Sequence, residues 1–157
     1  MKLRNFIFHP ITVSGVSLLA TLCFCFATIL LSHGKRDVYS LYYVAPIGIP
    51  FIAFLFDRAE RWNEFNFVML ITEIITVGLS LARAKAAIPF LSGHALFLTY
   101  AILTSKSLVA RIAATLVMIQ VLYLKLFVWH DLEVFGGVFL GVIAGIVFNM
   151  QTKHVIN

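Results

Sequence analysis

Two short segments of the chain carry a histidine beside charged residues, and each lies at the edge of an apolar run. The first is Ser92-Gly93-His94, and the second is Lys125–Glu133, which contains His130. The two histidines are 36 positions apart, which is long enough for the chain to cross a membrane and return. Both histidines would then lie on one face of the bilayer, so the sequence predicts a chemical site there.

The two histidines suit the two halves of a phosphoryl transfer. A neutral imidazole can attack phosphorus, and an imidazolium can protonate the leaving alkoxide. Glu133 follows His130 by three residues, so it would lie one helical turn away and could orient the ring. Asp131 is the alternative orienting acid if this segment is a loop. The scheme requires no metal and no cofactor.

Cations near both segments predict a phosphate site. Arg83 and Lys85 precede the first segment, and Lys125 opens the second. They could stabilise the negative charge that phosphoryl transfer places on the equatorial oxygens. Ser92 and Gly93 suit a cap and a flexible approach to the apolar helix that follows. The N-terminus of that helix would also favour an anion.

The composition is that of an integral membrane protein. Of the 157 residues, 61% are hydrophobic and 12% are charged, and the mean hydropathy is +0.98. A soluble domain carries about twice that charged fraction. We therefore expect one transmembrane domain over residues 1–157, with the site motifs within 83–137. The net charge of +5 comes in scattered pairs, whereas a nucleic-acid binder gathers basic residues on one face, so no nucleic-acid partner is expected.

Six apolar segments predict an all-α protein with six transmembrane helices in one bundle. They are Ile11–Leu31, Leu41–Phe56, Phe65–Leu81, His94–Leu103, Leu108–Trp129 and Val134–Met150. The fourth segment is short: even extended to Lys106 it covers ~20 Å of helix, against ~30 Å of hydrocarbon. His94 should therefore lie below the membrane surface, in a recessed pocket that Ile88–Leu91 approaches as non-helical chain.

The distribution of basic residues predicts the orientation. With six spans, seven basic residues share a side with the termini: Lys2, Arg4, Arg58, Arg61, Lys106, Arg111 and Lys153. Five lie on the other side: Lys35, Arg36, Arg83, Lys85 and Lys125. Three of those five flank the histidines, and without them the comparison is seven to two. The positive-inside rule then places the termini in the cytoplasm and the site on the outer face, as in a bacterial cytoplasmic (inner) membrane.

Three charged residues outside the site also carry expectations. Arg58 and Arg61 are interpreted as orientation signals that contact lipid headgroups. Glu73 lies in the middle of the third apolar segment, where a carboxylate is expensive. It is expected to pair with a basic residue, or to bond to Ser or Thr on a neighbouring helix, away from the histidines.

The two histidine segments resemble motifs of a known family. Ser92-Gly93-His94 resembles the core of the Pro-Ser-Gly-His motif of the type 2 phosphatidic acid phosphatase, or lipid phosphate phosphatase, superfamily. Lys125 through Gly137 resembles its last motif, an Arg, a His six residues on, then an Asp and a Gly. The resemblance, over Arg83–Gly137, implies a six-span enzyme that hydrolyses a phosphomonoester or pyrophosphate of a membrane lipid. It assigns the nucleophile, which forms a phosphohistidine, to His130, the orienting acid to Glu133 and the general acid to His94.

The chain departs from the family pattern at several positions. Leu91 stands where the family has Pro, and Lys125 replaces Arg and precedes His130 by five residues. The acid is Glu133, three residues after His130, where the family has Asp at four. The family's first motif, a Lys six residues before an Arg-Pro, is absent. These departures define either a divergent short member with its own substrate or a member that binds lipid phosphate without hydrolysing it.

Three functions follow as hypotheses. The first is a metal-independent, membrane-embedded lipid phosphatase whose partner is a phosphorylated membrane lipid. The second is a non-catalytic protein that binds or transports a lipid phosphate on the same scaffold. The third is a small membrane scaffold or transporter subunit in which His94 and His130 are incidental. Phosphate release separates the first from the second, and histidine replacement separates both from the third.

Overall fold

The computed structural model describes residue 23, residues 36–83 and residues 88–156. This part of the chain is all-α, as predicted. Its helices are α3 (Arg36–Glu60), α4 (Phe67–Ala82), α5 (Gly93–Thr104), α6 (Leu108–Tyr123) and α7 (Glu133–Ile156). A short 3-10 helix, η1 (Trp62–Glu64), follows α3, and a π-helical segment, η2 (Leu124–Val128), extends α6. The predicted segments after residue 40 each overlap one of these helices, while the first, Ile11–Leu31, falls outside the described ranges.

Two helical stretches are long and apolar enough to cross a membrane. They are Leu108–Val128, which joins α6 to η2, and Glu133–Thr152 in α7. α4 and α5 are apolar but shorter. The 12 residues of α5 correspond to ~18 Å of helix, so the predicted shortness of this segment is confirmed.

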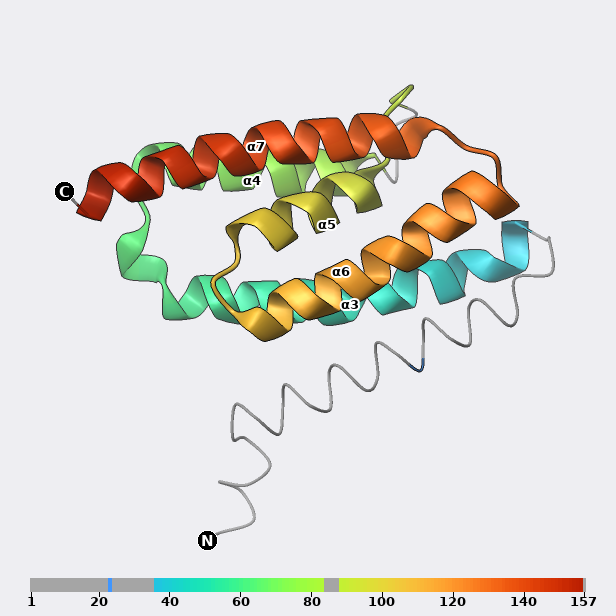
Figure 1. Cartoon of the computed structure of the whole chain (residues 1–157), viewed down its shortest axis with the longest axis horizontal. Coiled ribbons are helices and arrows are strands. Elements are labelled where there is room, and N and C mark those ends of the chain that lie inside the picture. The colour runs from blue at the N-terminus through green and yellow to red at the C-terminus, as the bar shows by residue number, and fades with distance from the viewer. Residues whose placement is uncertain (1–22, 24–35, 84–87, 157) are drawn as a thin grey trace, which may run out of the picture.

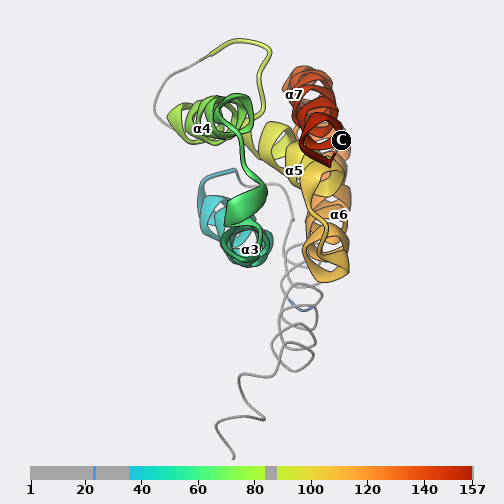
Figure 2. The same ribbon diagram turned by 90° about the vertical axis from the view of Figure 1, so that its left-hand side faces the viewer.

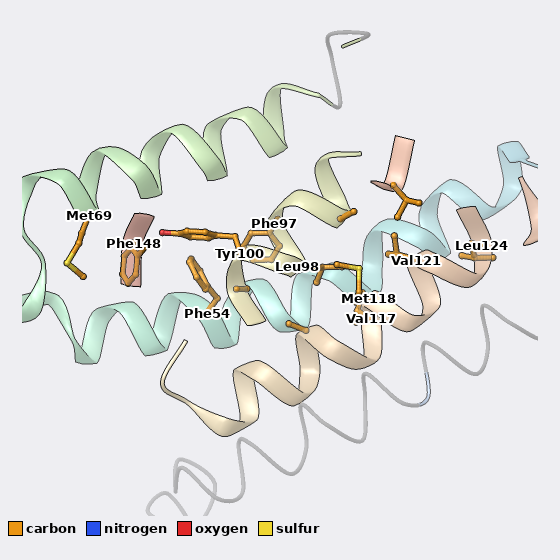
Figure 3. Close-up of a cluster of buried hydrophobic side chains, with 14 residues drawn as sticks. Phe54, Met69, Phe97, Leu98, Tyr100, Val117, Met118, Val121, Leu124 and Phe148 are labelled. Atoms are coloured by element: carbon orange, nitrogen blue, oxygen red, sulfur yellow. The ribbon is translucent and has the colours of Figure 1, made fainter. Parts of the chain in front are cut away.

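α5 occupies the centre of the helix arrangement. In Figure 1 it lies between α4 and α7 on one side and α3 and α6 on the other, and the end view in Figure 2 agrees. Its residues are buried nearly all round, as expected of a helix that is apolar on every face. Tyr100 packs edge-on against Phe148 of α7, with ring centroids 5.9 Å apart, and Phe97 packs edge-on against Phe54 of α3 at 5.3 Å (Figure 3).

Glycines on α7 allow it to approach α5 closely. A Cβ at Gly141 would lie 2.8 Å from the carbonyl oxygen of Leu96 and 2.7 Å from Cβ of Thr99. A Cβ at Gly137 would lie 2.4 Å from the carbonyl oxygen of Ser92. Side chains do not tolerate such distances, so glycine at these positions sets the spacing between the two helices. That spacing also brings the start of α7 beside the start of α5.

A buried charged cluster, which we call the Arg58 cluster, joins α3 to α4 and α5; its members are Asp57, Arg58, Arg61, Glu73 and Tyr100. Arg58 is 6% exposed, and its Nε donates to Oε1 of Glu73 at 2.8 Å. The Tyr100 hydroxyl donates to Oε2 of the same carboxylate at 2.6 Å. The guanidinium of Arg58 lies 4.2 Å from the ring centre of Phe54 and 4.8 Å from that of Phe148. The pairing predicted for Glu73 is thus confirmed, with Arg58 as its cation.

The same cluster fixes the turn between α5 and α6. Asp57 accepts hydrogen bonds from the backbone N–H groups of Lys106 and Ser107, at 3.1 Å and 2.7 Å. It also pairs with Arg58 and Arg61, whose side chains are 7% and 8% exposed. The interpretation of these two arginines as headgroup contacts is therefore wrong. Both arginine side chains are buried inside the protein and paired with acidic residues.

Candidate functional site

The two histidine segments lie together at one end of the bundle. α5 and α7 begin at this end and α6 finishes there, opposite the Arg58 cluster (Figure 1). The backbone N–H of Ser92 donates to the carbonyl oxygen of Glu133 at 3.0 Å. This bond ties the start of α5 directly to the start of α7. Segments more than thirty positions apart thus share one corner of the fold.

The first segment adopts the predicted local structure. Ser92 is the N-cap of α5, and its hydroxyl accepts a hydrogen bond from the N–H of Ala95 at 3.4 Å. Ser92 and Gly93 are buried, and His94, in the first turn, is half-buried. Residues 88–91 are not helical, as expected. Phe90 has a φ of 62°. A Cβ on residue 136 would lie 1.8 Å from the carbonyl oxygen of Phe90, so only glycine fits at Gly136.

The second segment differs from its predicted shape around His130. The expected helical turn from His130 to Glu133 is not formed, because α7 begins only at Glu133. His130 lies in the connecting loop with a φ of 50°, a left-handed conformation that is uncommon for residues other than glycine. Asp131 favours this path: its Oδ1 accepts a hydrogen bond from the N–H of Glu133 at 2.9 Å, and its own N–H donates to the carbonyl oxygen of Lys125 at 2.6 Å.

Four charged side chains form a cluster between the two segments. Nη2 of Arg83 lies 2.9 Å from Oε1 and 2.8 Å from Oε2 of Glu133. Nζ of Lys125 lies 3.4 Å from Oε2 of Glu133 and forms a second ion pair with Asp131. Arg83 also donates through Nε to the carbonyl oxygen of Leu91 at 2.6 Å. We call Arg83, Lys125, Asp131 and Glu133 the site cluster.

The site cluster is partly sheltered from solvent. The side chains of Lys125 and Asp131 are 10% and 12% exposed, and those of Arg83 and Glu133 are 26% and 27% exposed. Ion pairs with this much shelter are screened less than surface pairs. Opening the cluster therefore costs the interaction energy of these pairs unless another group replaces it.

The two histidines stand in different surroundings. His94, in the first turn of α5, is half-buried at the end of the bundle where α7 also begins. His130 is exposed, and its side chain forms no hydrogen bond or ion pair among the residues that the structure describes. The acids proposed to orient it, Glu133 and Asp131, face cations instead.

Sequence reasoning selected every member of the site cluster but not its pairing. Arg83 and Lys125 were predicted to hold phosphate, whereas here they hold the two acids. Lys85, the third predicted phosphate ligand, lies outside the described residues. The only sequence signal for the pairing of Arg83 with Glu133 is their opposite charge. Because the two residues are 50 positions apart, that signal does not identify them as partners. Within the described ranges, no group of three or more His, Cys, Asp or Glu side chains could hold a metal ion.

No family model, curated protein or solved structure matches this chain. The site residues and their geometry are therefore the basis for assigning a function. Two histidines, two cations and two acids come from chain segments far apart in the sequence. Such a set can bind an anion, transfer a proton and supply a nucleophile.

Proposed function

We propose that this protein is a membrane-embedded lipid phosphatase that hydrolyses a phosphomonoester or pyrophosphate of a membrane lipid through a phosphohistidine. The observation that supports this most is the hydrogen bond from Ser92 N–H to the Glu133 carbonyl, which joins the two histidine segments. Both histidines, with the cations Arg83 and Lys125, thereby belong to one end of the bundle.

The proposed reaction has two steps. In the first, an unprotonated ring nitrogen of His130 attacks phosphorus, and the bond from phosphorus to the leaving oxygen breaks. His94, as an imidazolium, gives its proton to that oxygen. In the second, neutral His94 takes a proton from water, whose oxygen attacks the phosphohistidine. The bond from phosphorus to the His130 nitrogen breaks, its electron pair returns to the ring, and inorganic phosphate leaves. Both histidines are then in their starting protonation states.

The cations and the helix start supply the electrostatic stabilisation. Arg83 and Lys125 would bind the equatorial oxygens, where charge develops in the transition state. The free N–H groups of the first turn of α5, which begins at Gly93 after Ser92, add donors of the same polarity. Because Glu133 is paired with Arg83 in this structure, it can orient His130 only after that pair opens.

The membrane would present the substrate from the side. Large apolar residues are exposed on α4 and α7, among them Ile74, Ile75, Phe139 and Ile146. Two helical stretches have the length and composition to cross a bilayer. A lipid tail can stay in the hydrocarbon while the phosphate reaches the site cluster at the end of the bundle. The orientation proposed for the chain, with cytoplasmic termini, puts that end at the outer face.

A second candidate is a protein that binds or transports a lipid phosphate without hydrolysing it. The pairing in the site cluster favours this candidate, because both orienting acids face cations and none is bonded to His130 among the described residues. Two of the departures from the family motifs fall on members of the site cluster, Lys125 and Glu133. Phosphate release distinguishes the two candidates.

The test uses purified protein in lipid nanodiscs with a metal chelator present. The substrates are phosphatidate, phosphatidylglycerophosphate, undecaprenyl pyrophosphate and a lipid A phosphate. We expect phosphate release from at least one of them, and its loss in H130A and in H94A. Binding of a lipid with no release would leave the second candidate. If folded protein shows no binding and no release, both candidates are excluded.

A further inference from the structure

Glu133 lies where the proposed function places the substrate's phosphate. Both of its carboxylate oxygens are within 3.0 Å of Nη2 of Arg83, at 2.9 Å and 2.8 Å. One of them is also 3.4 Å from Nζ of Lys125. These two cations are the described residues that would bind the phosphoryl oxygens. A carboxylate and a phosphate therefore compete for the same donors.

The backbone holds Glu133 in this place. It is the first residue of α7, its N–H donates to Oδ1 of Asp131 at 2.9 Å, and its carbonyl oxygen accepts from Ser92 N–H at 3.0 Å. The side chain is thus fixed at its root while its carboxylate reaches Arg83. Movement of the carboxylate away from Arg83 requires only side-chain rotation, because neither backbone bond involves the carboxylate.

The charge balance makes the competition strong. Among the described residues of the site cluster, the two positive charges of Arg83 and Lys125 are matched by the two negative charges of Asp131 and Glu133. A phosphate that entered beside an unmoved Glu133 would face a like charge at close range, which is costly. Arginine pairs with carboxylate and with phosphate through the same planar donors, so one anion can replace the other.

We infer that Glu133 is an internal ligand of the anion site, which a phosphate must displace from Arg83 in order to bind. The inference rests on the proposed function for the identity of the incoming anion. Glu133 thereby sets the affinity of the site, because the free energy of its pair with Arg83 is subtracted from that of phosphate binding. It also excludes weakly binding anions such as the carboxylates of other lipids. On displacement, its carboxylate becomes free for His130.

The experiment compares anion binding by E133Q and D131N. Each change removes one negative charge from the site cluster, so the two variants have the same net charge. Glu133 forms an ion pair with Arg83, whereas Asp131 forms one with Lys125. An Asn at 131 can still accept the hydrogen bond from the N–H of residue 133. Binding is measured by calorimetry on protein in nanodiscs of phosphatidylcholine, first with inorganic phosphate and then with phosphatidate in the disc. Circular dichroism confirms that each variant is folded, and E133D is a second variant that keeps the charge.

We expect E133Q to bind at least one of the two phosphate sources ~5-fold or more tightly than wild type, the lower end of typical coupling between sites. D131N should gain clearly less, and R83Q should lose binding. Tighter binding of phosphatidate alone would assign the site to a lipid headgroup, and tighter binding of both sources would assign it to the phosphate group itself.

Two outcomes would overturn the inference, and they differ in what they say of the proposed function. If R83Q loses binding but E133Q binds no more tightly than wild type or D131N, Glu133 is not a competitor while the phosphate site stands. If no variant, E133Q included, binds either source, then the anion site itself is wrong and the proposed function fails with it.

Discussion

Arg83 and Glu133, 50 positions apart in the chain, form an ion pair in which one guanidinium nitrogen lies 2.9 Å and 2.8 Å from the two carboxylate oxygens. Arg83 is the residue directly after α4, and Glu133 is the first of α7. The pair therefore connects two helices next to the start of α5, where His94 lies. A substitution of Arg83 or Glu133 therefore changes both the charge of the site and a contact between α4 and α7.

Glu133 should matter more than Asp131 for turnover. E133Q keeps the shape of the side chain but removes the charge that would stabilise a cationic His130, so we expect a fall of ~10²-fold or more, the size of a lost catalytic group. D131N should have a milder effect because Lys125 keeps Glu133 as a partner. Turnover of both variants is measured in matched nanodiscs. If D131N is the damaging change and E133Q is nearly silent, Asp131 orients His130 through the loop.

Removal of Arg58 should destabilise the fold more than removal of an exposed arginine. R58M removes the cation that pairs with Glu73, while Asp57 keeps Arg61, and breaking a buried ion pair in this way typically costs ~3–5 kcal/mol. R111M is the matched control, because Arg111 is exposed. Thermal unfolding of both variants in the same detergent gives the comparison. Equal midpoints for the two variants would show that the Arg58 cluster contributes little to stability.

Gly141 and Gly78 should respond in opposite ways to alanine. In G141A the new methyl group would meet Leu96 and Thr99 below 3.0 Å, and such overpacking costs ~1–3 kcal/mol. In G78A nothing lies within 4 Å of the new methyl group, so the gain in helix propensity remains, ~0.5–1 kcal/mol. Unfolding in denaturant measures both changes. A stabilising G141A would mean that α7 can move away from α5 at no cost.

Acid should remove the stabilising contribution of Glu64. Hydrogen bonds from Lys106 and then from Arg61 hold the pKa of this carboxyl below its usual value. A lowered pKa in the folded state means that the contribution is present above the pKa of the unfolded chain and is lost as pH falls through the folded pKa. The difference in melting temperature between wild type and E64Q should therefore be largest at neutral pH and shrink towards acid. A difference that is the same at both ends would argue against this ion pair.

The helices could be predicted from sequence because their signals are local. Runs of apolar residues located α3 to α7, and Ser92 before an apolar run marked the start of α5. The loop around His130 could not be predicted in the same way. The spacing from His130 to Glu133 fits a helical turn, but the hydrogen bond from Glu133 N–H to Asp131 starts α7 three residues after His130.

Ion pairs between distant segments could not be predicted from the sequence either. The sequence indicated that Glu73 needs a partner, but not that Arg58 would be buried to provide it. It likewise placed Arg83, Lys125 and Glu133 in one site without showing that they would neutralise each other. Such pairings depend on how helices pack, which here depends on close approaches such as that of Gly141 to α5.

The central claim is that His130 carries the phosphoryl group during hydrolysis of a lipid phosphate. The most direct measurement is a rapid quench of purified protein with lipid labelled in its phosphate, followed by peptide mapping under alkaline conditions, where phosphohistidine survives. H154A serves as the histidine control. The account predicts label on the peptide that contains His130 in wild type and in H154A, and none in H130A. Phosphate release that continues in H130A, or lipid binding in wild type with neither label nor release, would contradict it.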